Sequence, residues 1–263
     1  MPQALGADYV LVNVPAFEVY LWRGGAQAQT WTAVVGKIAT PTPQLSATIT
    51  GVTFNPWWDV PPSIARGGNF SAKGGYIVTR GRVRQRPGPR NALGQMKVEM
   101  PNPYAIYLHD TPSKGLFGAA VRTFSHGCVR VADPLSLAAK LLEGVRSRDS
   151  IDVLLGNKDR DEARGRISKP PPSGPLAQPS EPPPIKTTTV RLRADIPVYI
   201  AYFTAAPRPD GSLGFLPDIY GRDARIIDPA KRGKACSASV AVAAAPPDLR
   251  KAGENGNQGD PGP

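Results

Sequence analysis

The stretch TFSHGCVR, residues 123–130, places a serine, a histidine, a glycine and a cysteine in four consecutive positions. Cys128 is one of two cysteines, and the only histidine outside the stretch, His109, lies 19 residues before it. Near neutral pH only a few per cent of an ordinary thiol is thiolate, so a cysteine nucleophile needs a base nearby. An imidazole within hydrogen-bond reach can take the thiol proton and later return it to a leaving amine. The stretch predicts a thiol active site.

The roles of the neighbouring residues follow from their positions. Gly127 allows close approach of the backbone, and the consecutive amides of His126, Gly127 and Cys128 can point at a developing oxyanion. His109 is the candidate base, because His126 is only two residues from the cysteine and is better placed to shape the loop. A backbone carbonyl competes with Asp110 as the group that orients the imidazole, since neighbouring side chains in a strand point to opposite faces.

Two simpler interpretations of the stretch compete with the active site. Cys128 can be a small buried apolar residue, with both histidines as satisfied structural residues. One Cys and two His without a CxxC pair or an obvious fourth ligand make a poor structural zinc site, so no metal is expected.

The composition sets wider limits. The 263 residues are 41% hydrophobic, which is enough for a core in part of the chain. A net charge of +11 implies attraction to nucleic acid, acidic membranes or cell-envelope polymers, without choosing among them. The N-terminus lacks a basic stretch followed by an apolar run, and no run reaches transmembrane length. Cys128 and Cys236 lie 108 positions apart and are expected to be free thiols.

Short β-branched and aromatic runs dominate the first sixty residues and predict a sandwich or barrel whose first two strands form an antiparallel pair. A helix with Asp133 as N-cap and a proline at its first position is expected just after the cysteine stretch. The expected strands are 9–14, 17–22, 30–35 and 47–54, and the expected helix is 134–144.

Two segments between these strands and the cysteine are candidates for a cleft. Trp57 and Trp58 lie among three prolines, where a rigid loop is expected that either walls a cleft or packs its rings locally. Residues 105–109 predict a strand with Tyr107 and His109 on one face. Four arginines occupy alternate positions, so in an extended segment they would share one face: Arg80, Arg82, Arg84 and Arg86. This face is either a solvated strand edge or a contact for substrate carboxylates or an anionic polymer.

The C-terminal part alternates between strand-like and proline-rich composition. Eight of the sixteen residues from 169 to 184 are proline, which favours extended linker chain. Strands are expected again at 187–192 and 197–204, followed by a turn at 208–211, and can complete the core. The tail has little apolar surface to offset the entropy of ordering and is expected to be disordered.

His109, fifteen intervening residues and SHGCVR together resemble the YkuD-type L,D-transpeptidase catalytic domain. The segments ITGVTFNPWWDVPPSI, PNPYAIYLHDTPSKGLFG, RTFSHGCVRVADP and PDIYGRD are similar to signatures of its larger Gram-negative subfamily, which carries a capping insertion. The resemblance covers roughly residues 8 to 225. It implies a mainly β, mixed sandwich or barrel-like fold with a few short helices, in a chain that is the catalytic part of a longer protein or a truncated form.

The resemblance also implies domain boundaries and site residues. Cys128 would be the nucleophile and His109 the base, with the amides of residues 126–128 as oxyanion hole. The substrate pocket would contain Tyr107, Ser125, Arg130, Trp57 and Trp58. The catalytic domain would span 8–156 with a shortened capping insertion at about 57–91, followed by a linker at 157–186, completing strands at 187–228 and a flexible tail at 229–263.

The implied reaction joins the tetrapeptide stems of peptidoglycan. The thiolate would attack the L-centre carbonyl of diaminopimelate, D-alanine would leave, and a neighbouring diaminopimelate amine would take the acyl group in a 3→3 cross-link. A monomer in the periplasm or cell envelope is implied, open to carbapenem-class β-lactams and with neither cofactor nor nucleic acid partner. An L,D-carboxypeptidase, a D-amino-acid exchange enzyme and a non-catalytic cell-wall-binding module remain alternatives.

Overall fold

The N-terminal β-branched runs form the predicted antiparallel pair, β1 (Tyr9–Asn13) and β2 (Glu18–Arg23), in the computed structural model. The structure describes residues 4–156, 185–207 and 212–224. In β2 alternate side chains, Val19 and Leu21, are buried, as expected for a strand with one face on a core, whereas four of the five residues of β1 are buried. Two compact units divide the chain, residues 1–221 and 222–263, and the features described below belong to the first.

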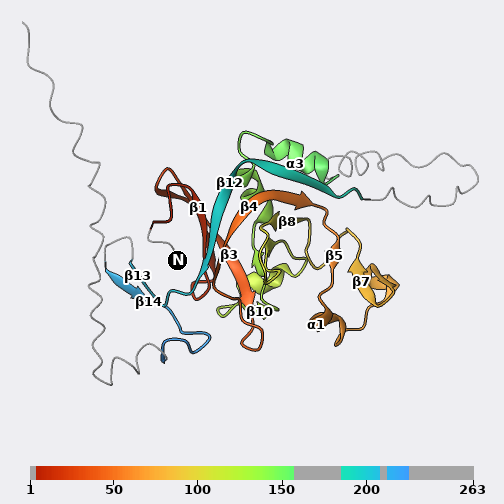
Figure 1. Ribbon diagram of the computed structural model, residues 1–263, viewed down its shortest axis with the longest axis horizontal. Coiled ribbons are helices and arrows are strands. Elements are labelled where there is room, and N and C mark those ends of the chain that lie inside the picture. Colours follow the sequence, from red (N-terminus) through yellow and green to blue (C-terminus); the bar gives the residue numbers. More distant parts are fainter. Residues whose placement is uncertain (1–3, 157–184, 208–211, 225–263) are drawn as a thin grey trace, which may run out of the picture. The chain divides into compact units, whose positions relative to one another are not determined.

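A nine-stranded sheet contains this pair and curves back on itself (Figure 1). The strand order is β10-β3-β11-β9-β8-β4-β12-β1-β2, and an additional β2–β3 pairing joins the last strand to the second. The fold is therefore mainly β with a barrel-like sheet, as predicted. The further strands of the sheet are β3 (Ala26–Gly36), β4 (Leu45–Phe54), β8 (Met96–Glu99), β9 (Leu108–His109), β10 (Thr123–Ser125), β11 (Val129–Val131) and β12 (Thr188–Ala201).

Three short strands in the middle of this order carry the candidate site. β9 pairs in parallel with β11, so that Arg130 is the register partner of His109. On the other side β8 pairs antiparallel with β9, which places Lys97 opposite His109. The predicted strand at 105–109 is limited to its last two residues.

The segment after the proline-rich stretch forms a single long strand instead of two. β12 lies between β4 and β1, antiparallel to the first and parallel to the second. Its register against β4 shifts between Arg191 and Ile196, so the strand stays continuous across an irregular pairing where composition suggested a break.

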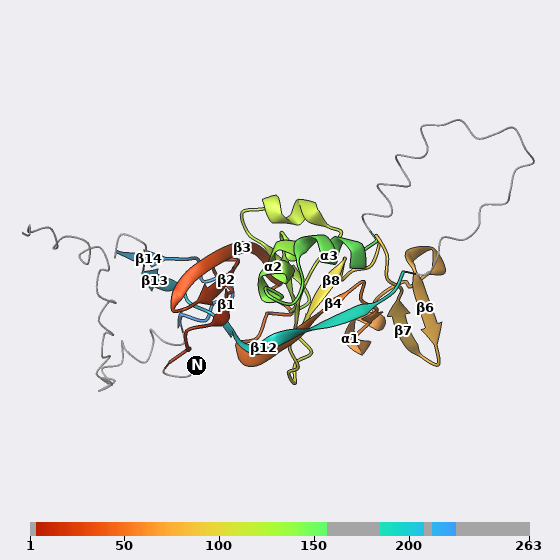
Figure 2. The ribbon, with the colours of Figure 1, turned by 90° about the horizontal axis from the view of Figure 1, so that it is seen from above.

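Two helices follow the cysteine stretch and lie side by side on one face of the sheet (Figures 1 and 2). The predicted helix is α2 (Pro134–Leu141), and the Asp133 carboxylate accepts a hydrogen bond from the Ser136 backbone N–H as N-cap. α3 (Arg148–Leu154) was not predicted, because only Ile151 of its seven residues is buried and its apolar pattern is short. No helix among the described residues is long and apolar enough to span a lipid bilayer.

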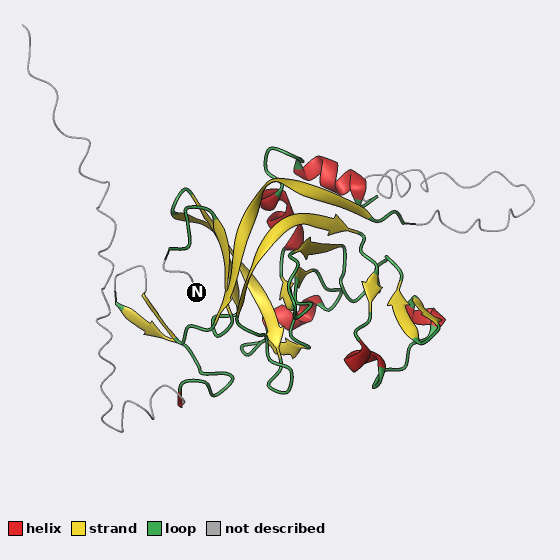
Figure 3. Ribbon diagram, in the orientation of Figure 1, coloured by secondary structure: helices red, strands yellow, loops and turns green. Residues whose placement is uncertain are grey.

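A second, three-stranded sheet stands apart from the main one (Figure 3). Its strands are β5 (Trp58–Asp59), β6 (Tyr76–Thr79) and β7 (Arg82–Gln85), in the order β5-β7-β6. The predicted rigid loop at Trp57–Trp58 therefore continues into a two-residue strand. The prediction that four arginines share one strand face is wrong for Arg80, which has a φ of 47° in the turn between β6 and β7.

The remaining described elements are short. They are α1 (Pro62–Ala65), 3-10 turns at Ala72–Gly74 and Lys114–Gly118, and the hairpin of β13 (Ala205–Pro207) and β14 (Leu213–Phe215). The predicted linker up to residue 184, the turn at 208–211, the tail from 229 and Cys236 lie outside the described residues.

Candidate active site

Cys128 lies in the loop between β10 and β11 with its thiol against Tyr107. The backbone N–H and the hydroxyl of Tyr107 both hydrogen-bond the sulfur and lower the pKa of the thiol, but burial has the larger effect and raises it overall. The sulfur is also 3.8 Å from the carbonyl oxygen of Ala105, to which the neutral thiol can donate. Arg130 and Lys97 favour the thiolate electrostatically. The resting nucleophile is therefore a partly exposed neutral thiol with several groups ready to stabilise its anion.

His109 is buried at the end of β9 with a neutral imidazole. Burial, followed by the positive charge of Arg130, lowers the pKa of His109 to about 3. Its Nδ1 hydrogen-bonds the backbone carbonyl of Asp110, which can only accept, so Nδ1 carries the proton. Nε2 is then the free basic nitrogen. The orienting group is the backbone carbonyl, one of the two alternatives left by the sequence.

The Asp110 carboxylate fixes this carbonyl from the opposite face of the strand. Its oxygens accept hydrogen bonds from the backbone N–H groups of Gln95 at 2.8 Å and Thr111 at 2.6 Å, and they pair with the Lys114 ammonium. A Cβ on Gly94, whose φ is +61°, would lie 2.3 Å from Asp110 Oδ2. Asp110 thus orients the imidazole through its own backbone.

Tyr107 lies between the thiol and the imidazole. Its ring contacts the His109 ring edge-on, with centroids 5.7 Å apart, and its hydroxyl reaches the sulfur. Among the described residues no hydrogen bond joins His109 to Cys128 directly, so the expected contact is not made in this arrangement. Arg130, beside both groups, has a buried Nε for which the described part of the chain offers no hydrogen-bond partner.

The cysteine loop is held by Ser125 and requires glycine at position 127. Ser125 Oγ donates to the Cys128 carbonyl at 2.6 Å and accepts from the Gly127 N–H at 3.1 Å. Gly127 has a φ of +115°, and an added Cβ would lie 3.0 Å from Ile106 Cδ1. The Gly127 amide, one of the three predicted for the oxyanion hole, is thus already engaged within the loop. Ser125, predicted to bind substrate, is buried and supports the loop.

A second loop, residues 36–42, supports the first one from outside. Thr42 Oγ1 donates to the Gly127 carbonyl at 2.8 Å, and the Lys37 N–H donates to the Ser125 carbonyl at 2.9 Å. Tyr220 in turn donates through its hydroxyl to the Gly36 carbonyl at 2.5 Å and accepts from the Thr42 N–H at 3.2 Å. The PDIYGRD segment is thereby connected to the cysteine loop.

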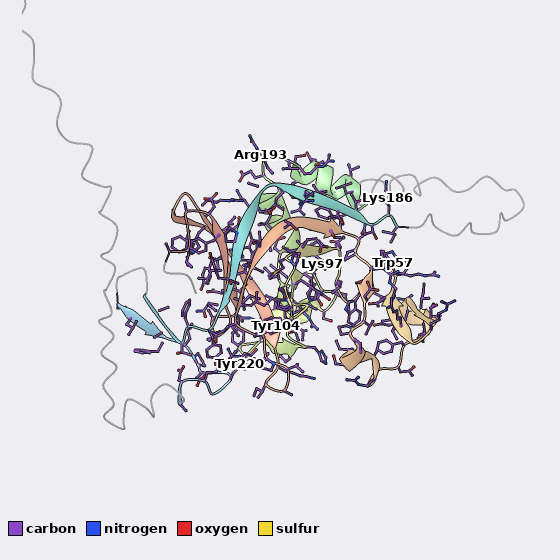
Figure 4. All side chains as sticks on the ribbon, in the orientation of Figure 1. Trp57, Lys97, Tyr104, Lys186, Arg193 and Tyr220 are labelled. Carbon is purple, nitrogen blue, oxygen red and sulfur yellow. The ribbon has the colours of Figure 1, made fainter. Side chains whose placement is uncertain are left out.

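The other predicted residues divide into two groups. Trp58 hydrogen-bonds the Tyr107 hydroxyl and so belongs to the thiol environment. Trp57 instead lies under the guanidinium of Arg84, 4.7 Å from ring centroid to Cζ, on the side of the small sheet (Figure 4). His126 is exposed, with Nε2 3.3 Å from the Lys37 ammonium, and makes no hydrogen bond to Cys128.

A family model described as the L,D-transpeptidase catalytic domain, YkuD, matches residues 7–153. The chain belongs to this family. A Haemophilus influenzae protein named "Putative L,D-transpeptidase" is 29% identical over 248 residues, covering 82% of this chain and 45% of that protein, so the chain spans about half of its relative's length. An L,D-transpeptidase structure from Mycobacterium smegmatis is 15% identical with a TM-score of 0.35, covering 51% of this chain and 52% of that one. The Enterococcus faecium L,D-transpeptidase C442S mutant is 13% identical with a TM-score of 0.36, covering 55% and 48%.

In this L,D-transpeptidase domain, the residues that sequence reasoning missed are those brought in by strand pairing and by the C-terminal segment. The ammonium of Lys97 lies 5.3 Å from the centroid of the Tyr107 ring and pairs with Glu99 at 3.1 Å. Thr42 and Tyr220 act on the cysteine loop from 85 and more residues away. Only the presence of PDIYGRD among the quoted signatures pointed to Tyr220.

Proposed function

We propose that this protein is a peptidoglycan L,D-transpeptidase that forms 3→3 cross-links through a thioester on Cys128. The observation that carries the proposal is the parallel pairing of β9 with β11, which sets Tyr107 and His109 beside Cys128 and Arg130. A nucleophile, a neutral base and a buried guanidinium in one place suit acyl transfer. If peptidoglycan stems are its substrate, the protein acts in the periplasm or cell envelope.

Acylation begins with transfer of the thiol proton. As the sulfur attacks the L-centre carbonyl carbon of diaminopimelate in a donor stem, the carbonyl oxygen becomes an oxyanion. The thiol proton passes to Nε2 of His109, for which the two side chains must first move into direct contact. The amides of His126 and Cys128 stabilise this charge, with Arg130 nearby. When the tetrahedral intermediate collapses, the C–N bond to D-alanine breaks, and His109 gives its proton to the leaving amine.

Deacylation repeats these steps in reverse with a different amine. The side-chain amine of diaminopimelate on an acceptor stem attacks the thioester carbon and gives up a proton to His109. The C–S bond then breaks, the new amide forms, and the sulfur recovers a proton from the imidazolium. The low pKa of His109 suits proton transfer during attack better than a preformed ion pair with the thiolate, because the neutral imidazole is the resting form.

Incubation with purified disaccharide-tetrapeptide, followed by mass analysis, tests the proposal. We expect a cross-linked dimer formed with loss of one D-alanine, and no product with the Cys128→Ala variant. Tripeptide alone would identify an L,D-carboxypeptidase, and incorporation of an added D-amino acid would identify an exchange enzyme. Salt-sensitive binding to sacculi without any Cys128-dependent product would overturn the enzymatic proposal in favour of a cell-wall-binding module.

A further inference from the structure

The β6–β7 hairpin, residues 76–86, belongs to a stretch of one-sided charge. Between Val60 and Met96 there is no acidic residue, whereas the basic residues are Arg66, Lys73, Arg80, Arg82, Arg84, Arg86 and Arg90. Val83 and Gln85 of β7 are buried on one face, and Arg82 and Arg84 are exposed on the other. The hairpin therefore presents an arginine-bearing face to solvent.

Only one arginine of this face is neutralised. Arg84 Nε pairs with Asp59 Oδ1 at 2.6 Å, across the β5–β7 pairing, and its guanidinium covers the Trp57 ring. Within the described ranges, no acidic side chain pairs with Arg80, Arg82 or Arg86. Lysine would serve equally well on a face that only repels other chains by its charge. Arginine differs in its planar guanidinium fork, which suits carboxylates.

The hairpin is held firmly at its base. Gln85 Nε2 donates to the carbonyls of Gly74 at 3.0 Å and Arg90 at 2.8 Å, and Gln85 Oε1 accepts from the Ala92 N–H at 2.8 Å. Asn91 Nδ2 donates to the Pro56 carbonyl at 3.0 Å. These hydrogen bonds fix the backbone from which the arginine side chains project.

The same base connects the hairpin to the thiol. Trp58 pairs with Gln85 in the small sheet, and its indole hydrogen-bonds the Tyr107 hydroxyl, which in turn hydrogen-bonds Cys128. One strand pairing and two hydrogen bonds therefore separate β7 from the sulfur. Trp58 therefore connects the arginine-bearing hairpin to the surroundings of the thiol.

We propose that Arg80, Arg82 and Arg86 bind the carboxylates of a peptidoglycan stem and hold it beside Cys128. The inference rests on the proposed function and adds the residues that recognise the charge of the substrate. Stem peptides carry several carboxylates in a short chain, which suits three exposed guanidinium groups spaced along the hairpin, in its turn at Arg80, on β7 at Arg82 and just after β7 at Arg86.

Equilibrium titration of disaccharide-tetrapeptide onto Cys128→Ala protein tests the inference without turnover. Adding Arg80→Gln, Arg82→Gln and Arg86→Gln should raise the Kd at least about fivefold at 50 mM NaCl, and the difference should shrink at 500 mM because salt screens exposed charges. Replacing the same three arginines with Lys, which keeps the charge but lacks the planar fork, should restore only part of the affinity.

A control set removes three exposed arginines outside the hairpin, Arg146, Arg191 and Arg193, on the same background. Arg193 is labelled in Figure 4. The Kd of the control set should stay within about twofold of the parent. An unchanged Kd in the hairpin variant, an equal loss in the control, or tighter binding of a single-stranded oligonucleotide than of the stem would overturn the inference. Absence of a dimer product with wild-type protein would instead count against the proposed function, since binding is measured on inactive protein.

Discussion

Tyr107 is the residue through which the parts of the site are connected. Its backbone and hydroxyl both reach Cys128, its ring lies against His109, and its hydroxyl accepts a hydrogen bond from Trp58. Burial and the neighbouring thiol raise the pKa of Tyr107, so the hydroxyl stays a donor at physiological pH. Its contribution is to stabilise the thiolate as that charge forms.

Replacing Tyr107 with Phe should make the thiol less reactive. The hydroxyl bond lowers the pKa of Cys128, so its loss should move the pH profile of iodoacetamide alkylation to higher pH and slow the reaction at pH 7 by about tenfold. Tyr104→Phe is the matched control, because that side chain is exposed and has no ring contact among the described residues. Equal profiles for both variants would contradict this role of the hydroxyl.

His109 should make the fold sensitive to acid. Its folded pKa of about 3 lies below the unfolded value of 6.5, so the unfolded chain binds the proton first, and stability is lost as pH falls from about 6.5 toward 3. Between pH 7 and pH 4.5 this group should cost about 3 kcal/mol. Urea unfolding of wild type and His109→Gln at both pH values measures it. A fall in stability that is the same in both proteins would contradict the burial of a neutral imidazole.

At the residue scale, the candidate reacting residues could be predicted from the sequence. The contacts that depend on the register of strand pairing could not. The sequence predicted the SHGC motif as a thiol site, with His109 as its base. It also predicted the shared face of Tyr107 and His109 and the N-cap at Asp133. Lys97 was not, because its proximity depends on how β8 pairs with β9. The engaged amide of Gly127 depends on a side-chain rotamer of Ser125, which no spacing rule predicts.

At the element scale, the cysteine loop depends on the loop at residues 36–42 and on the PDIYGRD segment. Gly36 is required there, since an added Cβ would lie 2.3 Å from the Thr40 carbonyl oxygen. Its carbonyl accepts from Tyr220, and its N–H donates to Thr42 Oγ1 at 2.8 Å. Tyr220 is a positioning residue that acts on Cys128 through these neighbours.

A double-mutant cycle with Thr42→Val and Tyr220→Phe tests this connection. Each change should slow acylation of Cys128 severalfold and lower stability by about 2 kcal/mol, because two backbone groups lose a hydrogen-bond partner in each variant. Since both act through one network, the double variant should lose less than the sum of the two single losses. Acylation rates are measured by intact mass, with Tyr104→Phe as the neutral control, and strictly additive losses would contradict the network.

The element predictions succeeded where a pattern was long and failed where a contact decided the outcome. The N-terminal strands and α2 followed from alternation and capping. α3 has one buried side chain, and β12 is one strand although its register against β4 shifts between Arg191 and Ile196. Arg80 left the strand face because its two-residue turn, completed by Gly81, needs positive φ at both positions.

At the scale of the whole catalytic unit, strand pairing brings residues that are far apart in the sequence close together in space. The parallel β9–β11 pair turns a separation of 19 residues into neighbouring strands, and the β2–β3 pairing closes the sheet around the core. The sequence predicted a barrel-like class from strand recurrence, whereas strand order depends on long-range pairing that no local pattern encodes. Part of the net charge of +11 is gathered on the β6–β7 hairpin, where Arg80, Arg82 and Arg86 are exposed, and this grouping in space follows from the pairing of β6 with β7.

The central claim is that Cys128 is an acyl-accepting nucleophile, and intact mass analysis after exposure to a carbapenem tests it most directly. A β-lactam carbonyl replaces the stem carbonyl, so opening of its ring by the thiolate leaves a stable thioester. The account predicts one added drug mass, located on the peptide that contains Cys128 and absent from Cys128→Ala. Folded, reduced wild-type protein that gains no mass, or that gains it at another residue, would contradict the account.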